Sequence, residues 1–268
     1  MTIPGRHFAN NLVLRRTLLF QLVRRDFETR FIGSAVGWLW GLIHPIVLLV
    51  SWVFVFQVCM HATLPPNEVT RNYSLFLFCG FLPWLLFQET VVRSASSLLD
   101  NTNLITKTVF PAEIVPVSIF LSSLISHLMA LVLVVAVVGF YNGHFSLWMF
   151  SLPIYMVLIG LFSIGVGWFV SSLQVYLRDT AQVISVVLTF WFWMTPIFIT
   201  EQMVPAPFRF LLRANPLAYV VRAYRDRLLS YRIPSLHDFA IVAAYSVTVF
   251  VLGGLFFRHL KRGFADVL

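Results

Sequence analysis

The chain has 268 residues, of which 59% are hydrophobic, 16% aromatic and only 11% charged. Soluble domains carry about 25% charged residues, so this composition excludes an ordinary soluble protein, and its hydrophobicity also excludes a disordered one. The net charge of +8 comes from 19 basic residues, all but Lys107 and Lys261 being Arg, against 11 acidic ones. A basic excess is typical of proteins that bind nucleic acid or an anionic membrane surface, and the positions of the charges decide between the two.

Long segments without any charged residue alternate with short charged segments. The uncharged segments are residues 31–67, 72–88, 114–177, 180–200 and 239–257. A transmembrane helix needs about 20 mainly apolar residues, whereas membrane β-barrel strands are short and alternate in polarity. The longest segment divides at the turn-forming residues Tyr141–His144. The pattern predicts an all-α integral membrane protein, a single transmembrane domain over residues 1–268, with six spans at about 36–60, 73–92, 113–140, 147–175, 182–200 and 238–258.

The distribution of Arg and Lys sets the expected orientation in the membrane. With both termini in the cytoplasm, twelve basic residues lie inside and seven outside, as the positive-inside rule prefers. The last outer segment carries six Arg and is an exception; it would lie inside only if residues 182–200 did not cross. Residues 1–30 contain six Arg and no apolar core, which predicts that no secretory signal peptide is present.

The segment 11–29 is predicted to be an amphipathic helix in the cytoplasmic interface. One face carries apolar side chains and the other carries polar ones; the apolar ones are Leu12, Leu19, Phe20, Val23 and Phe27. Such a helix lies flat in the interface with its Arg residues near lipid phosphates. It is either a topological anchor alone or a binding site for the headgroup of a substrate.

The segment 201–232 is predicted to form short re-entrant helices on the outer side. Pro205, Pro207 and Pro216 divide it, and Asn215 before Pro216 is a favourable helix start. Irregular backbone at membrane depth must be covered by protein or line a cavity. On the inner side, residues 93–113 are expected to be a polar loop with a short helix, and residues 176–179 a tight turn. Their charges alone indicate only ordinary solvated connections.

Small and aromatic residues inside the spans suggest how the helices pack. Glycines at 33, 37 and 41, and the set Ser163, Gly167 and Ser171, repeat every fourth residue, which predicts close approach of helices. Aromatic residues gather at 38–56 and at 190–193; they form either an interfacial belt or stacking surfaces for sugar rings. Cys59 and Cys79 are expected to be small buried hydrophobes rather than a disulfide.

The sequence lacks the groups that would let the chain work alone. No Gly-x-x-x-x-Gly-Lys-Ser/Thr motif is present, the seven His are scattered without metal-ligand spacing, and only Glu89 and Glu113 approach the spans, near their inner ends. An ion-driven transporter or an intramembrane hydrolase would need ionisable groups deeper in the spans. The chain is therefore expected not to be an enzyme, to hold no cofactor or metal, and to take its energy from another subunit.

Five motifs, in order along the chain, resemble those of the ABC exporter permeases for bacterial polysaccharides (O-antigen, teichoic acid or capsule). They are Arg30–Trp40 with Pro45, Asn103–Lys107 leading to Phe110–Pro111, Tyr176–Asp179, Thr195–Pro196, and Asn215–Pro216 followed by Tyr224–Arg225. The resemblance covers nearly the whole chain. It departs at Ile32, where the family often has a basic residue, so a phosphate contact is not carried over to that position.

The resemblance implies a homodimeric channel in the bacterial inner membrane, joined to two ATP-binding-cassette subunits that bind ATP and Mg. It implies docking of those subunits on the inner loops, at Asp100, Asn101, Asn103, Lys107, Arg178 and Asp179. It implies a substrate pathway along the first and fifth spans, at Trp38, Trp40, Phe190 and Trp193. It also implies an outer gate that includes Asn215, Pro216, Arg222 and Arg225.

These expectations combine into one functional hypothesis, export of a lipid-linked polysaccharide, most simply O-antigen. Arg24, Arg25 and Arg30 would hold the pyrophosphate of the lipid by charge-assisted hydrogen bonds. The alternatives are a teichoic acid or capsule permease, an ABC permease for a small lipid or drug, and a membrane enzyme or channel that needs no ATPase partner.

Overall fold

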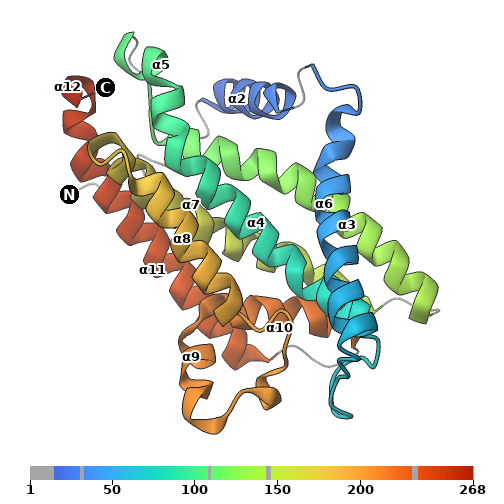
Figure 1. The fold of residues 1–268 in the computed structure, drawn as a ribbon. Coiled ribbons are helices and arrows are strands. Elements are labelled where there is room, and N and C mark those ends of the chain that lie inside the picture. Colours follow the sequence, from blue (N-terminus) through green and yellow to red (C-terminus); the bar gives the residue numbers. More distant parts are fainter. Residues whose placement is uncertain (1–14, 31–32, 108–109, 143–145, 231–234, 268) are drawn as a thin grey trace.

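The computed structural model of the chain describes residues 15–30, 33–107, 110–142, 146–230 and 235–267. These residues form helices and connections, with no β-strand among them (Figure 1). The predicted positions 11–14, 31–32, 143–144 and 231–232 lie outside the described residues, as does the side chain of Lys107.

Five helices in the described part of the chain are long and apolar enough to cross a membrane. They are α3 (Trp40–Val53) with its flanking turns over Gly37–Cys59, α4 (Tyr73–Asp100), α6 (Ile114–Asn142), α7 (Leu152–Tyr176) with the preceding turn from Leu147, and α11 (Leu236–Leu260). These agree with five of the six predicted spans. The helix at the remaining span, α8 (Thr180–Met194), is apolar but has only 15 residues, which is about 22 Å of helix.

The shorter helices lie at the two ends of the bundle (Figure 1). At one end lie α2 (Arg16–Thr29), which runs across the bundle, α5 (Thr102–Lys107) and the C-terminal α12 (Phe264–Val267). At the other end are α9 (Arg209–Ala214), α10 (Pro216–Leu229) and the connection between α3 and α4. The predicted interface helix and the predicted short helices of the 201–232 segment are thus present, at opposite ends.

Helix α4 forms the centre of the fold. It packs against α6, α7, α8 and α10, and most of its side chains are buried. Helix α7 continues the core toward α11, where the two backbones touch: a Cβ built on Gly253 would lie 2.1 Å from the carbonyl oxygen of Gly165. Only glycine at both positions permits this contact, which is a common means of packing membrane helices.

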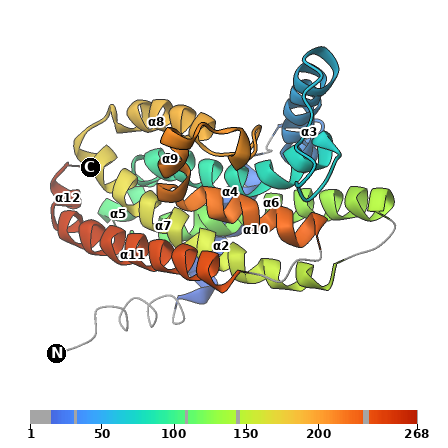
Figure 2. The ribbon, with the colours of Figure 1, turned by 90° about the horizontal axis from the view of Figure 1, so that it is seen from below.

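Helix α3 stands beside the bundle rather than in it (Figure 2). Only 11% of its most hydrophobic stretch is buried, against 72% for α4. Near its α10 end, Trp52 of α3 and Phe56 of the following turn contact Phe81 and Phe198, and α3 also contacts α6. The cavity described below lies between α3, α4 and α8.

Polar side chains fix where the helices begin. Asn72 accepts a hydrogen bond from the Leu75 amide at the start of α4, and Ser235 accepts one from the Asp238 amide at the start of α11. Asn215 caps α10 through the Leu217 amide, and Pro216 occupies the first turn, as the sequence predicted.

Three predictions from the sequence need correction. The short helix expected in the segment 93–113 does end at Asp100 and Asn101, but it is not separate from the span: α4 continues unbroken to Asp100, with Ser94 and Ser97 buried against the bundle. Gly33 and Gly37 do not pack against another described helix; both have positive φ, +78° and +59°, and form the turn that leads into α3. Cys59 is exposed rather than buried, whereas Cys79 is buried as expected.

Candidate functional site

A cavity of about 530 Å³ lies between α3, α4 and α8. One end is lined by aromatic side chains and the other by charged and polar ones. Its lining includes Trp40, His44, Trp52, Phe81, Gln88, Thr189 and Phe192, together with the charged residues Arg30, Glu89 and Arg93. A cavity with an apolar end and a charged end is suited to an amphiphilic ligand.

Trp52 is the centre of the aromatic end. Its ring lies 4.8 Å from that of Phe81 and 5.0 Å from that of Phe198, both edge-on, and 5.5 Å from that of Phe192. Phe198 in turn stacks on Trp193 at 5.1 Å. These contacts hold the rings in fixed orientations, so that their faces offer a pre-formed stacking surface.

The four predicted pathway residues are all exposed, but only Trp40 lines the cavity. Trp38 begins the same helical segment, while Phe190 and Trp193 lie on α8 with exposures of 69% and 59%. Sequence reasoning noticed Trp52 and Phe192 as members of aromatic clusters without assigning them a role. The spacing alone did not show that these two, rather than their neighbours, face each other across the cavity.

Arg30, Glu89 and Arg93 form the charged end, and Asp26 of α2 completes a group of two arginines and two carboxylates. Arg30 pairs with Glu89, and Arg93 donates to Asp26 at 2.5 Å; the crossed distances, Arg30 to Asp26 and Arg93 to Glu89, are both 3.7 Å. Burial raises the pKa of Asp26 above its ordinary value, and the nearby Ser122, Arg30 and Arg25 oppose that shift. This group, called the ionic quartet below, connects α2 to α4.

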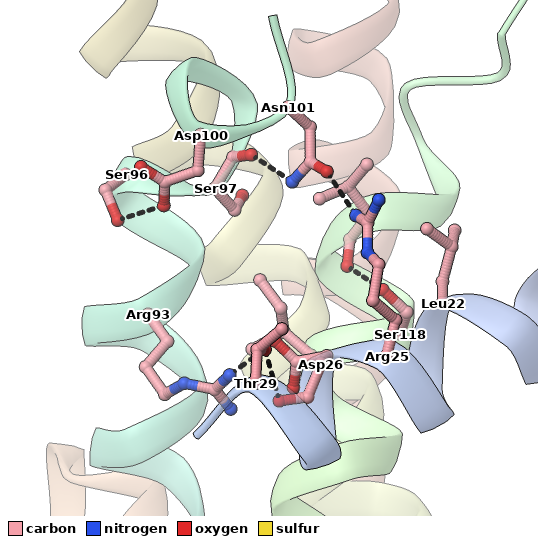
Figure 3. Close-up of a pocket in the computed structure, with 12 residues that line it drawn as sticks. Leu22, Arg25, Asp26, Thr29, Arg93, Ser96, Ser97, Asp100, Asn101 and Ser118 are labelled. Atoms are coloured by element: carbon pink, nitrogen blue, oxygen red, sulfur yellow. Dashed lines mark hydrogen bonds and ion pairs between the residues drawn. The ribbon is translucent and has the colours of Figure 1, made fainter. Parts of the chain in front are cut away.

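A second, polar cavity of about 400 Å³ lies between α2, the end of α4 and the start of α6 (Figure 3). Arg25 reaches across it and donates to Asn101 at 2.5 Å, and Asn101 donates to the Ser97 carbonyl at 2.8 Å. Arg93 and Asp26 line the same cavity from its other side. The interface helix is thus joined by hydrogen bonds to the residue that precedes α5.

The three arginines predicted to meet a lipid headgroup have different surroundings. Arg24 is exposed and pairs with Glu28 one turn along α2, at 2.7 Å. Arg25 points into the polar cavity, and Arg30 belongs to the ionic quartet with a side chain only 15% exposed. The quartet partners Asp26, Glu89 and Arg93 were not predicted. The feature of the sequence that could have predicted this group is that two carboxylates and two arginines lie at similar distances from the inner ends of their segments.

The predicted docking residues lie at the α2 end of the bundle. Asp100 and Asn103 are exposed beside α5, and Arg178 and Asp179 are exposed in the turn between α7 and α8. Gln174, which the sequence did not single out, holds that turn: its side chain donates to the Arg178 carbonyl at 2.7 Å and accepts from the Ala181 amide at 2.6 Å. The turn is rigid while its charges face outward.

The predicted gate residues form the junction between α10 and the end of α8. The side chain of Asn215 accepts from Trp191 at 3.0 Å and donates to Thr195 at 3.0 Å. Arg225 is buried and donates to three carbonyl oxygens, of Phe76 at 3.1 Å, Pro196 at 2.7 Å and Ile197 at 2.7 Å. Its guanidinium also lies 3.3 Å from the centroid of the Phe76 ring.

Two further arginines fix α10 to the helices around it. Arg222 pairs with Glu201 and with Asp238, the latter at 2.7 Å. Arg227 is buried and donates to the Tyr155 hydroxyl at 2.5 Å, a contact that was not predicted. Pairing or burial thus accounts for three of the six arginines of this segment, Arg222, Arg225 and Arg227.

In the described part of the chain, no group of three or more His, Cys, Asp or Glu could hold a metal ion. The features that remain as candidates for function are the amphiphilic cavity, the polar cavity beside it and the exposed turn between α7 and α8.

Comparison with known proteins finds relatives whose names describe export or transport. The chain is 29% identical over 254 residues to the O-antigen export system permease protein RfbA of Myxococcus xanthus, and 28% identical over 255 residues to the protein of that name from Klebsiella pneumoniae; each alignment covers 94% of this chain and 95% of the relative. The polysialic acid transport protein KpsM of Escherichia coli is 22% identical over 239 residues, covering 88% of this chain and 91% of KpsM.

A sequence profile of the family described as "ABC-2 type transporter" matches residues 17–229, from the interface helix α2 to the end of α10. Because this match spans most of the chain and takes in both cavities, the chain is a member of the ABC-2 type transporter membrane family.

Proposed function

We propose that this chain is the membrane-spanning subunit of an ATP-driven exporter that moves a lipid-linked polysaccharide, O-antigen, outward across the bacterial inner membrane. The observation that carries the proposal is similarity to two O-antigen export permeases over 94% of the chain. The aromatic cavity supports it, because ring faces bind sugars by stacking without requiring one hydrogen-bond pattern, which suits a sliding polymer.

The proposed architecture has six crossings with both termini in the cytoplasm. Helix α8 runs from the α2 end of the bundle toward the α10 end (Figure 1), which supports a sixth crossing beside the five longer helices. In this arrangement α2, α5 and the α7–α8 turn face the cytoplasm, and α9 and α10 form the outer gate.

The proposed assembly contains two copies of this chain and two ATP-binding-cassette subunits. The apolar surfaces of α3 and α11, buried only to 11% and 17% over their most hydrophobic stretches, support a second copy in addition to lipid. The sequence has no phosphate-binding loop of its own, so ATP and Mg are assigned to the partner subunits. Movement of those subunits would be transmitted to the spans through α5 and the α7–α8 turn.

A capsule polymer is the second candidate substrate. It is favoured by the similarity to KpsM, a polysialic acid transport protein, although at 22% identity this relative is more distant than the O-antigen permeases. Immunoblotting of cell-surface polysaccharides from a strain that lacks the chain separates the two candidates, because only the exported polymer disappears from the surface.

Alanine at Arg178 and Asp179 tests the proposed partnership. Both side chains are exposed, so the variant should fold, reach the membrane and melt at the wild-type temperature. Removing charges from a protein interface weakens it by about tenfold or more, and we expect polysaccharide export and transport-coupled ATP hydrolysis to fall accordingly.

The measurement is copurification of an ATP-binding-cassette subunit with the tagged chain, followed by ATPase assay and analysis of surface polysaccharide. The control is Arg71→Ala, which removes an exposed charge in the connection between α3 and α4, at the opposite end of the bundle. Normal export by the double variant would contradict the docking role, and absence of any ATPase from the wild-type preparation would contradict the proposed function.

The paired substitution of Trp38→Ala and Trp193→Ala tests whether the two exposed pathway residues outside the cavity also stack on the polymer. Trp38 is 50% exposed and Trp193 is 59% exposed, so removing these rings costs little free energy of folding. At roughly 0.7 kcal/mol for each stacked ring, we expect export of long polymer to fall about tenfold. Gel analysis of polysaccharide chain length measures this, with Phe140→Ala, an 89% exposed ring on α6, as control. Unchanged chain length and amount would refute the stacking role.

A further inference from the structure

The ionic quartet lies between the two cavities. Asp26 lines the polar cavity, Arg30 and Glu89 line the amphiphilic cavity, and Arg93 lines both. Figure 3 shows Arg93 and Asp26 joined at the edge of the polar cavity. The four side chains therefore form the wall that separates a polar space at the inner end of the bundle from an aromatic one beside α3.

The charges in this wall balance, and they are held without deep burial. Two guanidinium groups face two carboxylates, and the side-chain exposures lie between 15% and 26%. Ion pairs with partial access to water are close to neutral in energy, because the attraction is offset by lost hydration. An anion of higher charge can therefore compete with the carboxylates for the two guanidinium groups.

The surroundings supply further hydrogen-bond donors for such an anion. Ser123 accepts from Arg30 at 3.1 Å and from Arg93 at 3.4 Å, and Ser126 accepts from Arg30 at 3.4 Å. Each hydroxyl also has a proton to donate. Two guanidinium forks and adjacent hydroxyls match the oxygens of a phosphate or diphosphate better than they match a carboxylate.

We propose that Arg30 and Arg93 form a binding site for the diphosphate of an amphiphile. Without that ligand, Asp26 and Glu89 pair with the two arginines. The diphosphate displaces both carboxylates and opens the wall between the two cavities. This inference rests on the proposed function, because the lipid-linked substrate would be that amphiphile. The apolar or sugar part would then lie against Trp40, Trp52 and Phe192 in the same cavity.

The proposal predicts that removing one negative charge strengthens binding. Glu89→Gln leaves Arg30 with a weaker competitor, so affinity for a diphosphate amphiphile should rise about tenfold. Arg93→Gln should lower the affinity about tenfold, because it removes one of the two guanidinium groups. A merely structural role for Glu89 would lower the affinity or leave it unchanged, so the sign of the effect is diagnostic.

The test uses the full-length chain in phosphatidylcholine nanodiscs, with farnesyl diphosphate as the probe and its binding measured by calorimetry. Farnesol supplies the same chain without phosphate and should not bind detectably. Inorganic pyrophosphate and phosphatidylglycerol are added as competitors. The matched control is Arg16→Gln, which removes an exposed arginine of α2 that lines neither cavity, and should leave the affinity unchanged.

Higher affinity in Glu89→Gln together with lower affinity in Arg93→Gln supports the site, and weak competition by pyrophosphate and phosphatidylglycerol assigns it to a diphosphate amphiphile. Equal or lower affinity in Glu89→Gln overturns it, as does equal competition by either competitor.

Asp26→Asn, with the same expected gain in affinity, replaces Glu89→Gln if that variant does not fold. If the affinities follow prediction but deletion of the chain spares surface polysaccharide, the proposed function fails and the site stands.

Discussion

Arg225→Met is expected to lower the melting temperature of the purified chain by on the order of 10 °C and to abolish export. The guanidinium supplies the hydrogen bonds of three carbonyl oxygens, those of Phe76, Pro196 and Ile197. Losing them leaves buried carbonyls without donors, which costs about 3 kcal/mol or more. Melting in detergent, followed by size-exclusion chromatography with fluorescence detection, measures the effect.

Two related variants and one control make the result specific. Arg225→Lys retains the charge but not the planar set of donors, so its melting temperature should fall between those of wild type and Arg225→Met. Gly80→Ala should reproduce part of the loss, because its Cβ would lie 2.5 Å from the Arg225 guanidinium. Arg213→Met, at an exposed position on α9, should melt like wild type. A wild-type melting temperature for Arg225→Met would refute this account.

Gly253→Ala is expected to prevent α7 and α11 from packing, with a loss of about 3 kcal/mol and little folded protein recovered. The added Cβ would lie 2.1 Å from the Gly165 carbonyl oxygen, and backbone cannot rotate away as a side chain can. The measurement is the yield of monodisperse protein together with its melting temperature.

Gly254→Ala is the matched control, at the next position of the same helix. Its Cβ would meet only the edge of the Trp168 ring, at 3.3 Å, and the ring can move slightly. We expect this variant to express at nearly the wild-type yield. Equal yields for both alanine variants would show that the Gly165–Gly253 contact is not required.

Much of the helical arrangement could be predicted from where charged residues are absent. The uncharged segments predicted the five long helices, and Asn215 followed by Pro216 predicted the start of α10. Both predictions depend on strong patterns within short stretches of sequence. A short helix was expected within residues 93–113, but its continuity with the span was missed because residues 93–100 are polar. Their helix is held by burial of Ser94 and Ser97 against neighbouring helices, which sequence periodicity did not reveal.

The candidate site was predicted only in outline. Aromatic clusters on the first and fifth spans were identified, but which rings face the cavity depends on how α3 leans on Phe81 and Phe198. The ionic quartet depends on where the chain places α2 beside α4, a long-range contact between residues more than 60 positions apart. Charges near segment ends are common, so Glu89 and Arg93 gave no distinctive signal before their partners were known.

The short length of α8 has a consequence for the bilayer itself. A hydrocarbon core is about 30 Å thick, and 15 residues of helix supply about 22 Å, a shortfall of roughly 8 Å. The irregular stretch after Met194 is buried, from Thr195 to Phe198, and is shielded by protein rather than offered to lipid tails. In the proposed six-crossing architecture, lipids next to α8 would compress to match its length, and a polar polymer crossing there would meet the thinnest part of the membrane.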